Sequence, residues 1–260
     1  MITRIAALAV ILLAVPVAAT AQTGPGDAGI YTTTLRNGLR VIAVEDRAAP
    51  VIQTSVWYGF GSVQETPGKT GLAHALEHMM FRGTPEISAG GLDDVTARLG
   101  AQMNAETSYD YTQFYFEMPA DKLDVALYTE ADRMQHAALR ASDWAIERNA
   151  VLNELDGDAS SPFFNLLARV RAAAFPGQPA GRTPLGSRED VARATVADIQ
   201  RYYHEWYAPN NATLVVAGDV DHATVFAKAA RYFAAIPSKQ LPAKSDASPV
   251  PAQGRTVEAE

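Results

Sequence analysis

Two of the five histidines of this 260-residue chain stand four positions apart, as His74 and His78 in the run TGLAHALEHMMFRGT. The run has helical composition and ends in a glycine, which predicts a helix over residues 71–83. On a helix, positions i and i+4 project from one face about one turn apart, so both imidazoles can reach a single metal ion. Glu77 lies beside them and is placed to take a proton from a metal-activated water rather than to act as a ligand.

A catalytic zinc site needs a third protein ligand and one position left open for water. Because the chain contains no cysteine, this ligand must be a His, Asp or Glu on another element. The best candidate is Glu154 in the helical run WAIERNAVLNELDGD, with Glu147 seven positions earlier on the same helix face. One carboxylate could bind the metal while the other supports a histidine or the facing helix. The alternative is a solvated helix face with Arg148 as the partner, and the residues alone leave both open.

The elements that would position these residues mix strand and helix patterns without regular alternation. Asn37-Gly38 between two β-rich runs predicts a hairpin with a type I′ turn. The pattern therefore indicates an α+β domain: one mixed, mainly antiparallel sheet with helices packed on one face. The expected strands are 31–46 (the hairpin), 51–62, 101–108, 111–119 and 211–220, and the expected helices are 71–83, 90–100, 121–137, 141–158, 163–175, 195–207 and 222–236.

The two ends of the chain differ in composition from the rest. Residues 1–21 combine a short positive start, an apolar run and a small-x-small end, which predicts a cleaved signal peptide and export to the periplasm or beyond; a retained anchor is the alternative. We expect one domain over residues 27–237, then a proline-rich linker at 238–260 that leads to a missing second half. A net charge of -7 gives no electrostatic reason to expect nucleic acid as a partner, and no other segment looks membrane-spanning.

The run GLAHALEHMMFRGT resembles the zinc-binding helix of the pitrilysin/insulinase group of metallopeptidases, the inverted-motif zincins. This group includes the mitochondrial processing peptidase subunits and many bacterial zinc proteases. Its third ligand is a glutamate about 75 residues after the second histidine, a position that falls on Glu154, and a second glutamate seven residues earlier falls on Glu147. The runs LRNGLRVI, MNAETSYDYTQFY, RTPLGSREDV and YYHEWYAPNNATLVVAGDV also resemble the family, so the resemblance covers residues 31–237.

The resemblance implies one Zn²⁺ ion per chain and a role for each matching residue. It also implies that an edge strand holds the substrate backbone by strand addition, although an ordinary interior strand would have the same composition. The implied roles are zinc ligands for His74, His78 and Glu154, general base for Glu77, support of the ligands for Glu147, and substrate binding for Asn104, Ala105, Glu106 and Thr107.

We therefore expect a zinc-dependent endopeptidase that hydrolyses peptides or unfolded protein segments. Family members enclose the substrate between two related halves, and this chain holds only the metal-bearing half, so a second half or a paralogous subunit is the expected partner. A non-catalytic metal-binding or scaffold subunit is the first alternative. A zinc hydrolase that acts on a non-peptide substrate is the second, and the predicted substrate strand argues against it.

Overall fold

The computed structural model describes residues 29–244. The predicted signal peptide and residues 245–260 of the predicted linker lie outside this range. The strands are β1 (Ile30–Thr34), β2 (Arg40–Glu45), β3 (Val51–Tyr58), β4 (Gln102–Thr107), β5 (Thr112–Pro119) and β6 (Ala212–Gly218). The α-helices are α1 (Leu72–Met79), α2 (Gly91–Leu99), α3 (Leu123–His136), α4 (Ala141–Ala159), α5 (Pro162–Ala174), α6 (Arg188–Arg193), α7 (Val196–Trp206) and α8 (His222–Phe233). The sequence analysis did not predict α6.

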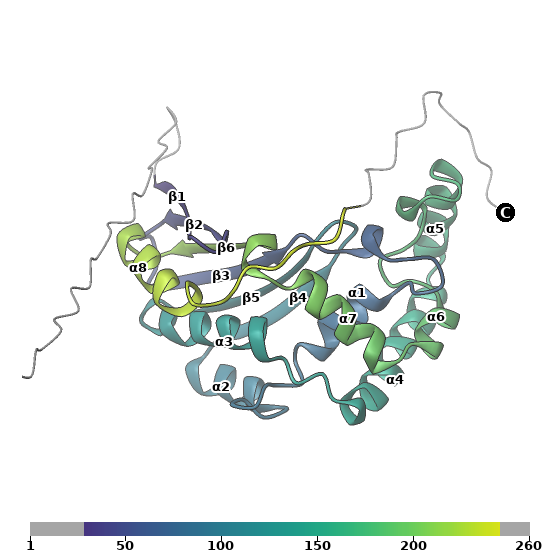
Figure 1. Ribbon diagram of the computed structural model, residues 1–260, viewed down its shortest axis with the longest axis horizontal. Helices are drawn as coiled ribbons and strands as arrows, with labels where there is room; N and C mark the ends of the chain where they lie inside the picture. The colour runs from purple at the N-terminus through teal and green to yellow at the C-terminus, as the bar shows by residue number, and fades with distance from the viewer. Residues whose placement is uncertain (1–28, 245–260) are drawn as a thin grey trace, which may run out of the picture.

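The six strands form one mixed sheet in the order β1-β2-β6-β3-β5-β4 (Figure 1). Within this sheet only the pair β2–β6 is parallel, and every other neighbouring pair is antiparallel. This confirms the predicted mixed, mainly antiparallel sheet. β4 occupies one edge and β1 the other, so the predicted substrate strand lies at an edge of the sheet.

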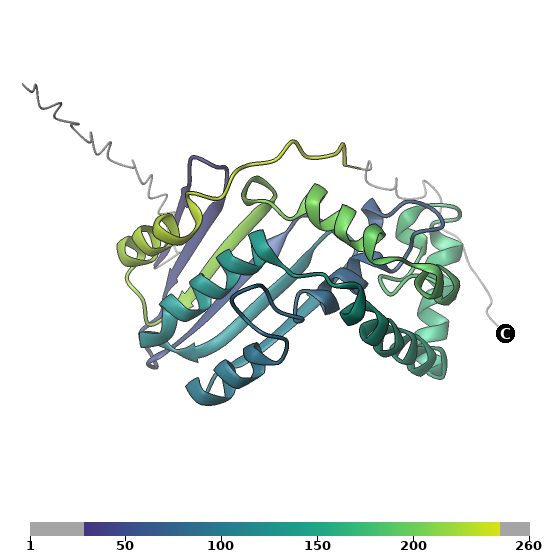
Figure 2. The ribbon, with the colours of Figure 1, turned by 60° about the horizontal axis from the view of Figure 1, so that its bottom comes forward.

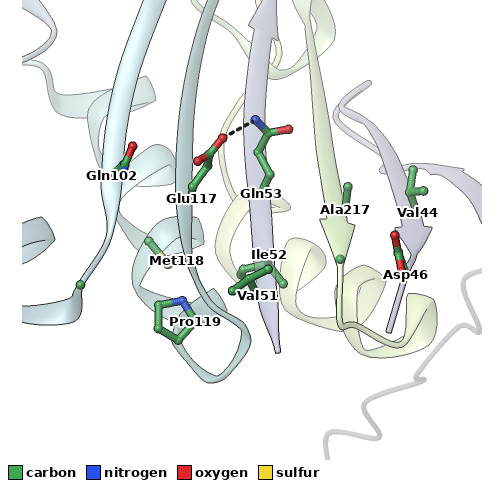
Figure 3. A pocket seen from close by; sticks show the side chains of 12 residues that line it. Val44, Asp46, Val51, Ile52, Gln53, Gln102, Glu117, Met118, Pro119 and Ala217 are labelled. Carbon is green, nitrogen blue, oxygen red and sulfur yellow. Dashed lines mark hydrogen bonds between the residues drawn. The ribbon is translucent and has the colours of Figure 1, made fainter. Parts of the chain in front are cut away.

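One face of the sheet is covered by helices, as the alternation of its side chains requires. Ile52 and Val56 of β3 point to the helix side and are buried. In Figure 2, α3 and α8 lie over the same face, whereas α4, α5 and α6 gather beyond the strand ends with α1. Gln53 and Glu117 point to the opposite face, where their side chains share a 3.3 Å hydrogen bond beside a hollow of about 560 Å³ (Figure 3).

The hairpin turn differs from the expected type I′ turn. Gly38 has a φ of +88° but Asn37 has no positive φ, and the Gly38 N–H donates to the Leu35 carbonyl at 2.9 Å. This is a three-residue loop in which a type I turn is followed by a left-handed glycine. The reason lies in the Asn37 side chain, whose amide donates to the carbonyls of Phe233 and Ile236 at 2.7 and 3.0 Å and so holds the end of α8.

A charged pair is fully buried beneath the sheet. The Arg133 guanidinium donates to Glu130 through Nε at 2.8 Å and through Nη2 at 2.5 Å, and both side chains are 1% exposed. The guanidinium carbon also lies 4.5 Å from the centre of the Phe114 ring. Two charges can stay in an apolar core when they are paired and hydrogen-bonded in this way.

α5 is the opposite case, because none of its side chains, all within the described range, is buried. Phe163, Leu166, Leu167 and Val170 are 69%, 47%, 43% and 44% exposed. Their spacing of i, i+3, i+4 and i+7 places them along one helix face, which we call the α5 apolar stripe. None of the helices between residues 29 and 244 is both long and apolar enough to cross a membrane.

Candidate metal centre

Three side chains from α1 and α4 converge with the spacing of metal ligands. The Nε2 atoms of His74 and His78 are 3.2 Å apart, and the two Glu154 carboxylate oxygens lie 3.3 Å from the first and 3.5 Å from the second. A tetrahedral ion with ligand bonds of about 2.0–2.1 Å needs neighbouring ligand atoms to be about 3.3–3.4 Å apart. Two imidazole nitrogens and one carboxylate thus lie close enough together to hold a single metal ion of this size.

The local packing explains why α4 turns its glutamates toward α1. Glu147, Val151 and Glu154 follow one another at i, i+4 and i+7, and Val151 is fully buried between the two carboxylates. Trp144 fixes the start of the helix, because it is buried and its indole N–H donates to the Ala194 carbonyl at 2.9 Å. The face of α4 that carries both glutamates is therefore the face that packs on α1.

The surroundings of the two imidazoles suit metal binding. Burial, and secondly the charge of His78, lowers the pKa of His74 to about 3, so this ring is neutral near pH 7. Glu147 lies 2.9 Å from His78 Nδ1 and also pairs with Arg82. A carboxylate at Nδ1 accepts the proton of that nitrogen and leaves the Nε2 lone pair free for a metal. The alternative of a solvated helix face with Arg148 as the partner does not describe Glu147, whose partners are His78 and Arg82.

Glu77 lies in a cavity of about 480 Å³ that His74, His78, Glu154, Glu147 and Asn104 also line. Its Oε2 accepts a 2.5 Å hydrogen bond from the Thr107 hydroxyl. Burial raises the pKa of Glu77, whereas the Thr107 hydrogen bond lowers it. A buried carboxylate with an elevated pKa beside a cluster of possible metal ligands has the properties that a general base requires.

The four residues predicted to bind the substrate do not share one environment. Among the described strands β4 pairs with β5 alone, so its outer edge has no partner strand. Asn104 lines the cavity and the Thr107 side chain holds Glu77. Glu106, unlike Thr107, points to the sheet face away from the helices, where its carboxylate accepts hydrogen bonds from Gln113 at 2.9 Å and Tyr111 at 3.2 Å. Neither Ala105 nor Glu106 is among the residues that line the cavity.

The remaining histidines lie outside this centre. His222 forms a second cluster of possible ligand atoms with Glu45 and Asp221. Its Nδ1 is already 2.7 Å from Glu45, and Asp221 caps α8, so local hydrogen bonds account for this cluster. His136 ends α3 and pairs with Asp132 at 2.9 Å. His204 is exposed, whereas its neighbours Tyr202 and Tyr203 face the core.

Two acidic residues that the sequence analysis missed bind the start of α1. Glu65 accepts hydrogen bonds from the backbone N–H groups of Gly71 and Ala73, and Asp190 accepts from the N–H and hydroxyl of Thr70. Neither stands at a helical spacing from the histidines, so no periodic pattern in the sequence points to them.

Comparison with known proteins places the chain in a family. The model of Insulinase (Peptidase family M16) matches residues 40–188, and that of the Peptidase M16 inactive domain matches residues 193–260. The chain therefore belongs to peptidase family M16, the insulinase family. This finding confirms the resemblance that the zinc-helix motif indicated.

The relatives include named zinc proteases. The chain is 34% identical over 220 residues to "Zinc protease PqqE" of Helicobacter pylori, covering 84% of this chain and 49% of the relative. It is 32% identical over 210 residues to the mitochondrial-processing peptidase subunit beta of Dictyostelium discoideum, covering 80% and 45%. The crystal structure of the first half of the periplasmic protease PqqL from Escherichia coli matches with a TM-score of 0.81 at 25% identity, covering 91% and 51%. The chain thus spans about half the length of the curated relatives it matches.

Proposed function

We propose that this chain is the metal-bearing half of a zinc-dependent endopeptidase. The observation that carries the proposal is the cluster of His74, His78 and Glu154 side chains around one cavity, with Glu77 lining the same cavity. The family supports zinc as the ion, because its members include named zinc proteases. A donor set of two imidazoles and one carboxylate also suits zinc.

The chemistry divides between the ion and the protein. A bound zinc ion would act as a Lewis acid, which lowers the pKa of water and polarises a carbonyl group. His74, His78 and Glu154 would hold it, and Glu147 would keep the His78 ring in the required tautomer. Glu77 accepts a proton as the water oxygen attacks the peptide carbon, and it returns this proton to the amine nitrogen as the C–N bond breaks.

β4 is the proposed binding site for the substrate backbone. Its outer edge has no partner strand within residues 29–244, and the Ala105 N–H donates to the Asn104 side-chain oxygen at 2.9 Å. Thr107 at the end of β4 contacts the proposed base. An extended peptide can add to such an edge through main-chain hydrogen bonds, which favours peptides or unfolded segments as substrates. Asn104 lines the cavity and is the β4 side chain expected to contact the substrate near the scissile bond.

We expect the metal-bearing half to work together with a second, related half. Because the chain spans about half of its relatives, the remaining half would complete the substrate chamber, either in the same polypeptide or as a paralogous subunit. We assign residues 27–237 to the metal-bearing domain and residues 238–260 to the linker. The periplasmic PqqL relative supports export, with residues 1–21 as the signal peptide. Activity of this half alone is then expected to be low.

The central experiment is a peptide digest, read by mass spectrometry, together with metal analysis of the same samples. Glu77→Gln should abolish cleavage by the complete two-half enzyme while about one zinc per chain remains bound. Glu117→Gln makes the same substitution on the uncovered sheet face and should leave both cleavage and zinc unchanged. Turnover by Glu77→Gln at the wild-type rate would refute the assignment of the base.

Metal content tests the ligands separately. His74→Ala should lose zinc, and an unchanged stoichiometry would exclude this residue as a ligand. If the wild-type protein binds zinc but the complete enzyme cleaves no peptide, a metal-binding subunit without catalytic activity replaces the peptidase proposal.

A further inference from the structure

The helix that carries both histidines has no cap of its own. α1 begins after Gly71, which adopts a φ of +80° and has no side chain to accept the free N–H groups of the first turn. Its conformation is fixed by close packing, because a Cβ atom at this position would lie 2.4 Å from the Leu185 carbonyl oxygen. A substituted side chain at Gly71 is thus excluded, and the donors of the first turn need an acceptor from elsewhere.

Glu65 supplies this acceptor from the loop before the helix. Its Oε2 accepts the Gly71 N–H at 3.0 Å and its Oε1 accepts the Ala73 N–H at 2.7 Å. The residue is only 4% exposed, and its own carbonyl accepts a 3.3 Å hydrogen bond from Arg182. A negative or polar oxygen at this end of a helix is also favoured by the helix dipole. Both carboxyl oxygens of Glu65 are therefore used to hold the first turn of α1.

His74 is part of this turn. α1 has eight residues and is about 12 Å long at 1.5 Å per residue, and His74 is its third residue. The position of its Nε2 atom relative to Glu154 depends on where the first turn lies, and fraying of this turn would move the ligand directly. His78 is one turn further along and has its own support in Glu147. Glu65 thus acts on the end of α1 that carries the less supported ligand.

We propose that Glu65 is a positioning residue for the metal centre, whose carboxyl group replaces the missing cap of α1 and holds His74 against Glu154. The expected effect on zinc affinity rests on the proposed function, whereas the capping hydrogen bonds of Glu65 are present in the metal-free chain. Glu65 touches neither substrate nor metal and acts through the backbone of Gly71 and Ala73. Thr70, the residue before Gly71, is held separately, because its N–H and its hydroxyl both donate to the Asp190 carboxylate.

Substitutions at Glu65 should have graded effects. An ionised carboxylate offers an acceptor on each of its two oxygens, the amide of Glu65→Gln offers one acceptor oxygen, and the side chain of Glu65→Ala offers none. We expect Glu65→Ala to raise the zinc dissociation constant by about tenfold or more, within the range typical for loss of a residue that orients a ligand. The value for Glu65→Gln should fall between wild type and Glu65→Ala. Competition with a chelator of known affinity measures these constants.

Asp221→Ala is the matched control. Asp221 caps α8 by accepting the Thr224 N–H at 3.0 Å, and α8 packs on the other end of the sheet. This variant should lower the Tm and leave zinc affinity unchanged. If Glu65→Ala and Asp221→Ala lower the Tm equally and bind zinc equally well, Glu65 is only a structural residue and the proposal is overturned.

Hydrogen exchange of the metal-free wild-type protein gives a test that needs no variant. The Gly71 and Ala73 amides should exchange as slowly as those inside α1, and exchange at the rate of a free peptide would contradict the capping. This measurement decides the capping even if Glu65→Ala does not fold. If the wild-type protein binds no zinc at all, the proposed function fails, while slow exchange of these two amides still establishes Glu65 as the cap.

Discussion

Glu147 offers a quantitative test of how the protein supports its proposed ligands. Its carboxylate is 13% exposed and has two partners, His78 Nδ1 at 2.9 Å and the Arg82 guanidinium. Glu147→Ala removes both interactions, so His78 loses the acceptor that fixes its tautomer. Removal of such a partner typically weakens metal binding about 10- to 100-fold, or about 1.4–2.8 kcal/mol. We expect Glu147→Ala near the upper end of this range.

Glu147→Gln should lie near the lower end, at about tenfold. Its amide oxygen can accept a hydrogen bond from either His78 or Arg82 but cannot serve both as the carboxylate does. A chelator competition measures the zinc dissociation constants of both variants. Thermal unfolding gives an independent reading, because each tenfold loss of affinity removes about 1.4 kcal/mol of zinc-dependent stabilisation when zinc is in excess.

The control for this series is Glu189→Gln. The wild-type Glu189 carboxylate lies on α6, pairs with Arg193 and is 75% exposed. It should leave zinc affinity unchanged. A Glu147→Ala protein that binds zinc as tightly as wild type would show that the His78 ring needs no carboxylate partner, and the reasoning about its tautomer would then be wrong.

Three further predictions concern stability and association. Burial raises the pKa of Asp198, but hydrogen bonds from Thr195 and Lys69 outweigh it and hold this pKa at about 2. The lowered pKa stabilises the folded state by about 2 kcal/mol above pH 4. Asp198→Asn should lose this stability at pH 6 and match wild type near pH 2; an equal deficit at both pH values in denaturant titrations would contradict the assignment. Arg133→Met should cost about 3–5 kcal/mol in the same assay because Glu130 is left buried without its partner, and Arg133→Met with Glu130→Leu should recover most of the loss; no recovery would argue against an unpaired charge as the cause. Lysine in place of Leu166 should reduce self-association of the isolated domain in sedimentation experiments, and unchanged association would show that the α5 apolar stripe is not the contact surface.

Residues that are close in the sequence could be placed in the site from their spacing, whereas residues far apart in the sequence could be placed only through the family resemblance. The spacing of His74 and His78 follows from helical period alone, and the structure brings their Nε2 atoms together. Glu154 is distant along the chain, so only the resemblance separated it from a solvated helix face. The parallel pairing of β2 with β6 is likewise invisible in the sequence, because the two runs lie about 170 residues apart.

Other features escaped prediction because tertiary contacts override local patterns. Asn37-Gly38 has the composition of a type I′ turn, yet the Asn37 side chain bonds to the end of α8 and the turn takes another form. Glu65 precedes α1 with no spacing that marks it as a cap. Its role depends on how the loop folds back onto the helix, which no periodicity encodes.

The two helices that carry the proposed ligands differ in how much of their side-chain surface is buried, and this difference affects how easily proteases can cut the protein. α1 is buried along nearly its whole length, whereas of the described side chains of α4 only Trp144 and Val151 are buried, and α5 contributes none. Segments with so few buried contacts open locally at a small fraction of the global unfolding free energy. An ion bound by Glu154 and the α1 histidines would suppress this local opening. The rate of proteolysis around α4 and α5 would then report the metal content of the protein under conditions in which the sheet is still folded.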